Sequence, residues 1–281
     1  MFLSGLKKEI KLFSRGFRFW GIIIAMIGFA VVYPGIYKMM ESMVEMMNNL
    51  GVEAGADMGD AAASLKQTMD SLVAIYGGEM AYVGFYTGIL GLTTEGFLVI
   101  SLLLMMAAGG EQKKRSVIMP NCAGLTPAGY ILPKFALYPI AITVINFFGV
   151  VLNALVSQAM FGVAIPVNTV IFSGVCISMF VFFAVSAYLF FGIATGRPGI
   201  GVVVMYLSIS LFPTILASVG VNKYNPFALR DMFITPVEQV DMNNFWLSLV
   251  VTVILSVIFC LLSLAITTAR KIENSVGEAN L

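Results

Sequence analysis

The chain contains no histidine, and only 11% of its 281 residues are charged. Histidine is the commonest metal ligand and general base, so its absence argues against enzymatic chemistry by this chain. Soluble domains carry about 25% charged residues, whereas here 59% of the residues are apolar. The composition therefore indicates a membrane protein and argues against a soluble enzyme.

Cysteine is scarce too. Of the three cysteines, Cys122 falls in a predicted cytoplasmic connection, and Cys176 and Cys260 fall inside apolar segments. None lies in an oxidising aqueous loop, so we predict no disulfide. No basic run with interleaved aromatic residues is present, which argues against nucleic-acid binding. No small-residue cleavage site follows the first apolar segment, so we expect no removable signal peptide.

Six segments are almost free of charge. Each is long enough to cross the hydrocarbon core of a bilayer, which takes about 20 helical residues. The six segments are residues 19–36, 86–108, 135–161, 167–193, 200–221 and 245–268. We therefore predict an all-α integral membrane protein with six transmembrane helices, which form one domain over residues 19–281.

Most of the basic residues lie on one side of the predicted membrane. Twelve of the 16 lie before span 1, between spans 2 and 3, between spans 4 and 5, or after span 6. The other side holds most of the carboxylates and only Lys38, Lys66, Lys223 and Arg230. Because basic loops stay in the cytoplasm, we predict a multi-pass protein of the cell membrane with both termini cytoplasmic. The larger outer connections are then residues 37–85 and 222–244.

Residues 1–18 combine two stripes at helical spacing. The apolar stripe consists of Leu3, Leu6, Ile10, Phe13 and Phe17, and the basic stripe of Lys7, Lys11, Arg15 and Arg18. This pattern predicts an amphipathic helix at the surface of the lipid bilayer, with its cations against anionic headgroups. The alternative is a helix that only anchors the chain and sets its topology.

The outer connection at 37–85 predicts two short amphipathic helices on either side of a hinge that contains Gly51, Gly55 and Gly59. Five methionines lie between residues 39 and 47. Thioethers are soft ligands that suit copper(I). Since no histidine or cysteine is nearby, we favour a flexible apolar face that packs on the outer leaflet or on a partner.

Glu95 lies well inside the second predicted span. Counting from Gln112 at 1.5 Å per residue places it roughly 25 Å up, in the outer third of the bilayer. An ionisable group there should face protein or water, so Glu95 is a candidate for the substrate path. The alternative is that the span breaks at Gly91 or Gly96 and that Glu95 only lines a watery outer vestibule.

The inner connection between spans 2 and 3, residues 111–134, contains more kinds of residue than a loop that only sets topology requires. It opens with a charge cluster, continues with a short apolar stretch, and closes with a lysine as span 3 begins. Its candidate residues are Glu111, Lys113, Lys114, Arg115, Ser116, Val117, Ile118, Met119, Leu125, Pro127 and Lys134. A surface that docks a cytoplasmic partner needs this mixture, whereas topology needs only the cations.

This connection resembles that of the membrane subunits of ABC-2-type ABC exporters. Those subunits have an amphipathic helix leading into span 1, six spans, and a glutamate-led cytoplasmic segment after span 2. An L-x-P stretch and a lysine then follow as span 3 begins. Here these positions are Glu111, Leu125-Thr126-Pro127 and Lys134, whereas Arg115-Ser116 replaces the Gly-Thr pair that commonly follows the glutamate.

The resemblance implies that the connection forms a coupling helix seated in a groove of an ATP-binding cassette subunit. It implies two such subunits, which hold ATP and magnesium, and two membrane subunits as a homodimer or a heterodimer. This chain has no G-x-x-x-x-G-K-[ST] motif, so it has no P-loop to cradle ATP. We therefore expect a permease subunit of an ATP-driven exporter. Its apolar spans with one acid suit an amphipathic or lipophilic substrate, such as a peptide, an antibiotic or a lipid.

Two other interpretations remain open from the sequence. One is a non-transporting membrane protein for assembly or anchoring, in which the inner connection docks a different cytoplasmic partner. The other is a secondary transporter, which normally shows charges in several spans and repeat symmetry. The sequence has only Glu95 deep in a span and no visible repeat.

Overall fold

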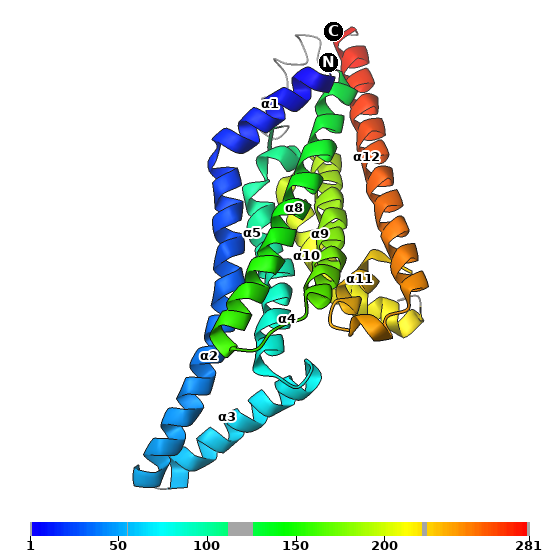
Figure 1. The fold of residues 1–281 in the computed structure, drawn as a ribbon. Helices are drawn as coiled ribbons and strands as arrows, with labels where there is room; N and C mark the ends of the chain where they lie inside the picture. Colours follow the sequence, from blue (N-terminus) through cyan, green and yellow to red (C-terminus); the bar gives the residue numbers. More distant parts are fainter. Residues whose placement is uncertain (1, 55, 112–125, 221–223, 280–281) are drawn as a thin grey trace.

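The computed structural model describes residues 2–54, 56–111, 126–220 and 224–279. Over these residues the chain is helical, and they include no strand. Both ends of the chain lie at one end of the helical bundle, and a hairpin of two helices projects from the other (Figure 1). We call these the terminal end and the arm end.

Five helical stretches are long and apolar enough to cross a membrane. They are Phe17–Met47, Met80–Leu103, Pro127–Phe161, Val167–Thr195 and Met242–Arg270. They coincide with five of the six predicted spans. The chain is therefore an all-α protein of the multi-pass membrane type.

The remaining predicted span, at 200–221, falls on helix α10 (Pro198–Val219). The apolar stretch found in α10 among the described residues is Pro198–Pro213. This is shorter than the ~20 residues that a span needs. A sixth crossing at α10 therefore stays a prediction.

Helix α2 (Phe17–Ala54) runs on from the first span into the arm, where α3 (Ala56–Ile75) leads back toward the bundle (Figure 1). Its 38 residues extend about 57 Å, well beyond a ~30 Å hydrocarbon core. The prediction of a separate short helix before the hinge was wrong. Residues 37–50 contain neither glycine nor proline, so nothing ends the helix there.

The second predicted span is interrupted. Helix α4 (Met80–Thr93) and helix α5 (Glu95–Leu103) meet at Thr94, which has φ −97° and ψ −74°. A π-helical turn, η1 (Met106–Gly110), follows, and in it Gly109 has φ 98°, a left-handed value that favours glycine. The possible break in this span therefore lies at Thr94, between the two glycines considered.

Helices α8 (Pro127–Phe161) and α9 (Val167–Thr195) pack along each other, and α9 is the most buried of the five spans. Helix α8 starts with Thr126 as its N-cap, whose Oγ1 accepts a hydrogen bond from the Gly129 N–H. It then continues through Pro133 and Pro139. The last part of the predicted coupling segment, from Pro127 on, is thus the start of α8.

The connection at 222–244 contains the short helix α11 (Pro226–Met232) and a 3-10 turn, η2 (Val237–Gln239), before α12 (Met242–Ala279). Arg230 of α11 donates a hydrogen bond from Nη1 to the Ile209 carbonyl of α10 at 2.6 Å. This carbonyl lies four residues before Pro213, which has no N–H to bond it. Arg230 therefore satisfies the backbone acceptor that Pro213 leaves without its helical partner.

Candidate functional site

Helix α1 (Phe2–Arg15) packs against the start of α8 at the terminal end (Figure 1). The two backbones touch at Gly5, where a Cβ atom would lie 2.5 Å from the Gly129 carbonyl oxygen. Glu9 and Phe13 follow Gly5 at intervals of four residues, and both are buried. These three residues form the face of α1 that meets the bundle.

Most of the rest of the predicted apolar stripe faces outward. Leu3 and Ile10 of α1 and Phe17 at the start of α2 are exposed, and Leu6 is half-buried. Phe13 packs edge-on against Tyr138 with ring centroids 5.6 Å apart. The exposed apolar residues suit contact with a membrane surface. A helix occupies Phe2–Arg15 of the predicted residues 1–18, and its position at a membrane interface stays a prediction.

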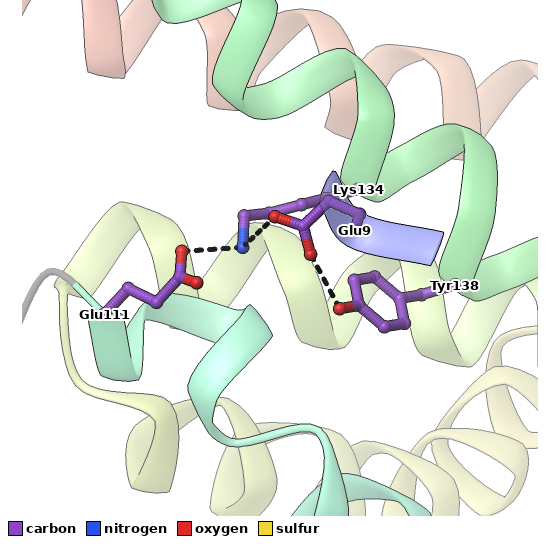
Figure 2. Close-up of polar contacts among 4 residues, drawn as sticks. All are labelled: Glu9, Glu111, Lys134 and Tyr138. Carbon is purple, nitrogen blue, oxygen red and sulfur yellow. Dashed lines mark hydrogen bonds and ion pairs between the residues drawn. The ribbon is translucent and has the colours of Figure 1, made fainter. Parts of the chain in front are cut away.

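Lys134 forms the centre of a buried charged cluster (Figure 2). Its Nζ lies 2.9 Å from Oε2 of Glu111 and 3.3 Å from Oε1 of Glu9. The other carboxylate oxygen of Glu9 accepts a hydrogen bond from the Tyr138 hydroxyl at 2.8 Å. The exposed fraction of the side chain is 0% for Lys134, 4% for Glu9 and 12% for Glu111. We call these four residues the lysine cluster.

The residues that α8 contributes to this cluster lie on one face of the helix. Tyr130, Lys134 and Tyr138 recur every four residues, so their side chains lie on one side of the helix. The Lys134 ammonium also lies 4.7 Å from the centroid of the Tyr130 ring. A cation over an aromatic face away from water contributes about 2 kcal/mol. The aromatic rings therefore help to hold the lysine charge where water is excluded.

Burial makes the pairing of these charges important, because an uncompensated buried ion costs several kcal/mol. Burial by itself raises the pKa of Glu111, but the nearby charge and hydrogen bond of Lys134, together with the charge of Lys8, outweigh it. The pKa of Glu111 is therefore lowered, and Glu111 is ionised at neutral pH. Glu111 and Lys134 form a true ion pair inside the fold.

The lysine cluster joins three segments that are distant in sequence. Glu9 comes from α1, Glu111 follows η1, and Lys134 lies two turns into α8. Glu111 and Lys134 are also the two ends of the predicted coupling segment, so their contact brings these two ends together. The structure brings together two of the predicted charged positions and adds Glu9 and Tyr138.

Most of the predicted coupling residues lie outside the described residues. They are Lys113, Lys114, Arg115, Ser116, Val117, Ile118, Met119 and Leu125. Glu111 lies in the lysine cluster, and Pro127 is the first residue of α8. The docking role of the segment therefore stays a prediction.

Glu95 lies apart from the lysine cluster, at the junction of α4 and α5, and its side chain is exposed. It accepts a hydrogen bond from the Thr94 hydroxyl, and the Tyr33 hydroxyl of α2 also lies within hydrogen-bonding reach. The Tyr33 ring lies directly on Gly91, where a Cβ atom would clash with it. Polar groups at the helix junction thus satisfy part of the carboxylate, and the rest faces out of this chain.

Sequence reasoning missed Glu9, Tyr130 and Tyr138. Glu9 is the one acidic residue among the first 18, which otherwise carry five cations. It also lies four residues before Phe13, which belongs to the apolar stripe. A lone acid in a basic helix, and a lysine with a tyrosine four residues to either side, are signals that indicate a buried ion pair.

Methionines from two helices gather at the start of the arm. Met39, Met43 and Met46 of α2 and Met160 of α8 line a pocket of about 510 Å³ together with Lys38. In the described part of the chain, no group of three or more His, Cys, Asp or Glu side chains could hold a metal ion. The mostly apolar lining agrees with the apolar character predicted for this face.

The chain matches no protein-family model, no curated protein and no solved structure. Its function therefore has to be inferred from the lysine cluster and from the sequence patterns.

Proposed function

We propose that this chain is the membrane subunit of an ATP-driven exporter of the ABC-2 type, with its ATPase on a separate polypeptide. The contact between Glu111 and Lys134 supports this proposal most directly (Figure 2). These are the two charges that the resemblance to ABC-2 subunits places at the ends of the coupling segment. A contact between them gives a docked segment a fixed base.

The contact between Glu111 and Lys134 is connected to the rest of the helical bundle. Lys134 belongs to α8, which has 35 residues and packs against α1, α2, α4, α9 and α12. Through Glu9 the same ammonium also holds α1. Because packed helices transmit strain, a force on the coupling segment would move α1 and the start of α8 as one body.

The charges of the lysine cluster need not be present for stability alone. Replacing a buried ion pair by well-packed apolar residues is often neutral or stabilising, so a buried pair is weak evidence of a purely stabilising function. A paired charge does fix which groups lie opposite each other. We infer that the lysine cluster sets the register between α1, the coupling segment and α8.

In the proposed complex, two ATP-binding subunits hold ATP and magnesium, and two membrane subunits enclose the path. Both termini are cytoplasmic, and α10 is the fifth of six spans. Glu95 then faces the path between the membrane subunits, because an ionised group facing lipid is costly. A carboxylate in otherwise apolar surroundings suits an amphipathic or lipophilic cargo, such as a peptide, an antibiotic or a lipid.

Purification from the native membrane tests this proposal. The wild-type chain should co-purify with an ATP-binding protein whose ATPase rate depends on this chain. Replacing Val117, Ile118 and Met119 by Asp should abolish the complex, since unpaired charge in an apolar contact costs several kcal/mol. Replacing Met39, Met43 and Met46 by Asp is the matched control in the arm and should leave the complex intact.

The competing interpretation as an anchoring protein predicts a different result from the same purification. A partner without ATPase activity would co-purify, and the triple Asp variant of the inner connection would release it. An ATPase rate that does not depend on the chain would contradict the exporter proposal.

A further inference from the structure

A cavity of about 440 Å³ lies between α1, α8, α9 and α12. Small-molecule sites are typically about 300–1,000 Å³, so this one has room for a ligand. Its lining includes Phe2, Phe135, Phe182, Ser186, Ser256 and Cys260, and none of the four residues of the lysine cluster. The cavity is therefore separate from the candidate coupling site.

The polar atoms of this lining are already satisfied. The Ser186 hydroxyl donates to the Phe182 carbonyl at 2.8 Å, and the Ser256 hydroxyl donates to the Thr252 carbonyl at 2.9 Å. The Cys260 thiol is free, and a thiol is only a weak donor. The cavity thus offers dispersion contacts and little hydrogen bonding, which suits a hydrocarbon chain.

The cavity is open toward the outside of the bundle. Val257 and Phe2, which both line it, have 52% and 41% of their surface exposed. Val257 belongs to the span Met242–Arg270, which has the highest mean hydropathy of the five and the smallest buried share. In a bilayer, the surface around this opening faces acyl chains, so one chain can enter from the side.

The helix at one edge of the cavity exposes only positive charge. Lys7, Lys8, Lys11 and Arg15 are exposed on α1, whereas its one acid, Glu9, is buried against Lys134. The same helix contributes Phe2 to the cavity. Cations next to a membrane surface attract anionic headgroups. The helix that carries these cations therefore also borders the hydrocarbon site.

We propose that an anionic phospholipid of the surrounding bilayer is a resident ligand of this chain, with one acyl chain in the cavity and its headgroup against the cations of α1. By touching Phe2, the bound chain holds α1 against α8. This inference requires only that the chain spans a bilayer, so it does not depend on the exporter proposal.

The test compares lipid retention by the purified full chain after delipidation and reconstitution with a mixture of phosphatidylglycerol and phosphatidylcholine that have identical acyl chains. Native mass spectrometry counts the bound lipids. We expect wild type to retain one phosphatidylglycerol. Ala136→Trp, which fills the cavity from α8, should lower this retention at least ten-fold. Ile254→Trp is the matched control, because Ile254 is 51% exposed on α12 and is not part of the cavity lining.

The headgroup contact has its own variant. Replacing Lys7, Lys11 and Arg15 by Gln should reduce the preference for phosphatidylglycerol by roughly five-fold per cation removed, as about 1 kcal/mol per basic residue implies. The neutral lipid should still fill the cavity of this variant. Retention without headgroup preference in wild type would indicate ordinary annular lipid and overturn the proposal.

A second measurement covers the case in which Ala136→Trp fails to fold. In a Cys122→Ser chain, Cys260 lines the cavity while Cys176 is fully buried. Phosphatidylglycerol should slow alkylation of Cys260 by N-ethylmaleimide several-fold and leave Cys176 unreactive throughout. Equal alkylation of Cys260 with and without the lipid would contradict the proposal. An Ala136→Trp chain that keeps its lipid but changes its subunit number would also contradict the proposal. That result would mean that the cavity holds a second copy of this chain.

Discussion

Lys134 and Glu95 are both ionisable residues within helical stretches long and apolar enough to span a membrane, but they differ in burial and in the groups around them. Lys134 is fully buried and has two carboxylates within 3.3 Å. Glu95 is exposed, and its carboxylate interacts with the hydroxyls of Thr94 and of Tyr33 on α2. The chain neutralises the charge of Lys134 by itself, whereas the outward-facing charge of Glu95 is available to water, cargo or another subunit.

The largest effect is expected from Lys134→Ala. Removing the cation leaves Glu9 and Glu111 buried without it, and breaking a buried pair from one side costs about 3–5 kcal/mol. Thermal unfolding in detergent measures the loss. Lys38→Ala is the matched control, because Lys38 forms an exposed pair with Glu41 at 2.6 Å, and such pairs contribute about 0–1 kcal/mol. Equal losses in the two variants would remove the distinction between buried and exposed charge.

A triple variant separates stability from coupling. Replacing Glu9 by Gln, Glu111 by Leu and Lys134 by Met removes all three charges together. Stability should return to within about 1–2 kcal/mol of wild type, since apolar substitutes for buried ion pairs are often neutral. If the cluster sets register, ATPase stimulation should stay low although the chain folds. A triple variant with wild-type stimulation would show that the cluster has no coupling role.

Acid should lower the free energy of unfolding by less than Lys134→Ala does. The pKa of Glu111 in the folded chain is lowered below its ordinary value of 4.5. The stability that this shift provides is therefore present above pH 4.5 and is lost as the pH falls through the lower, folded pKa. Unfolding in detergent at a series of pH values should show this loss in wild type. Glu111→Gln should flatten it, and an unchanged profile would mean that another group titrates.

The smallest effect on stability is expected at the exposed charge. Glu95→Gln and Glu95→Leu should each change the free energy of unfolding by less than about 0.5 kcal/mol, as for surface positions. Transport should nevertheless change while protein level and ATPase coupling stay intact. A Leu variant that transports at the wild-type rate would mean that Glu95 only occupies a bent helix.

The spans could be predicted because long apolar runs carry their own signal. The extent of α2 was underestimated, although the absence of glycine and proline from residues 37–50 was visible. The break at Thr94 could not be predicted, because threonine is no helix breaker. The backbone there departs from a continuous helix where Tyr33 of another helix lies on Gly91.

The site was predicted only in part for a similar reason. The resemblance singled out Glu111 and Lys134, and the structure shows that they touch. The contact of Glu9 with Lys134 and Tyr138 joins residues that are far apart in sequence. Local patterns mark Glu9 and Lys134 as unusual, but they do not show that the two residues meet, because the pairing depends on how α1 folds back over α8 at Gly5.

The hydrogen bond from Arg230 to the Ile209 carbonyl gives α10 an unusual mechanical property. An ordinary helix resists bending because each carbonyl is bonded to the turn that follows it. At Pro213 that restraint comes from a long side chain of a different segment. The stiffness of α10 at this point is therefore set by α11, which also packs on α9 and α12. A ligand that displaces α11 would make α10 easier to bend near Pro213, while every turn of α10 stays helical.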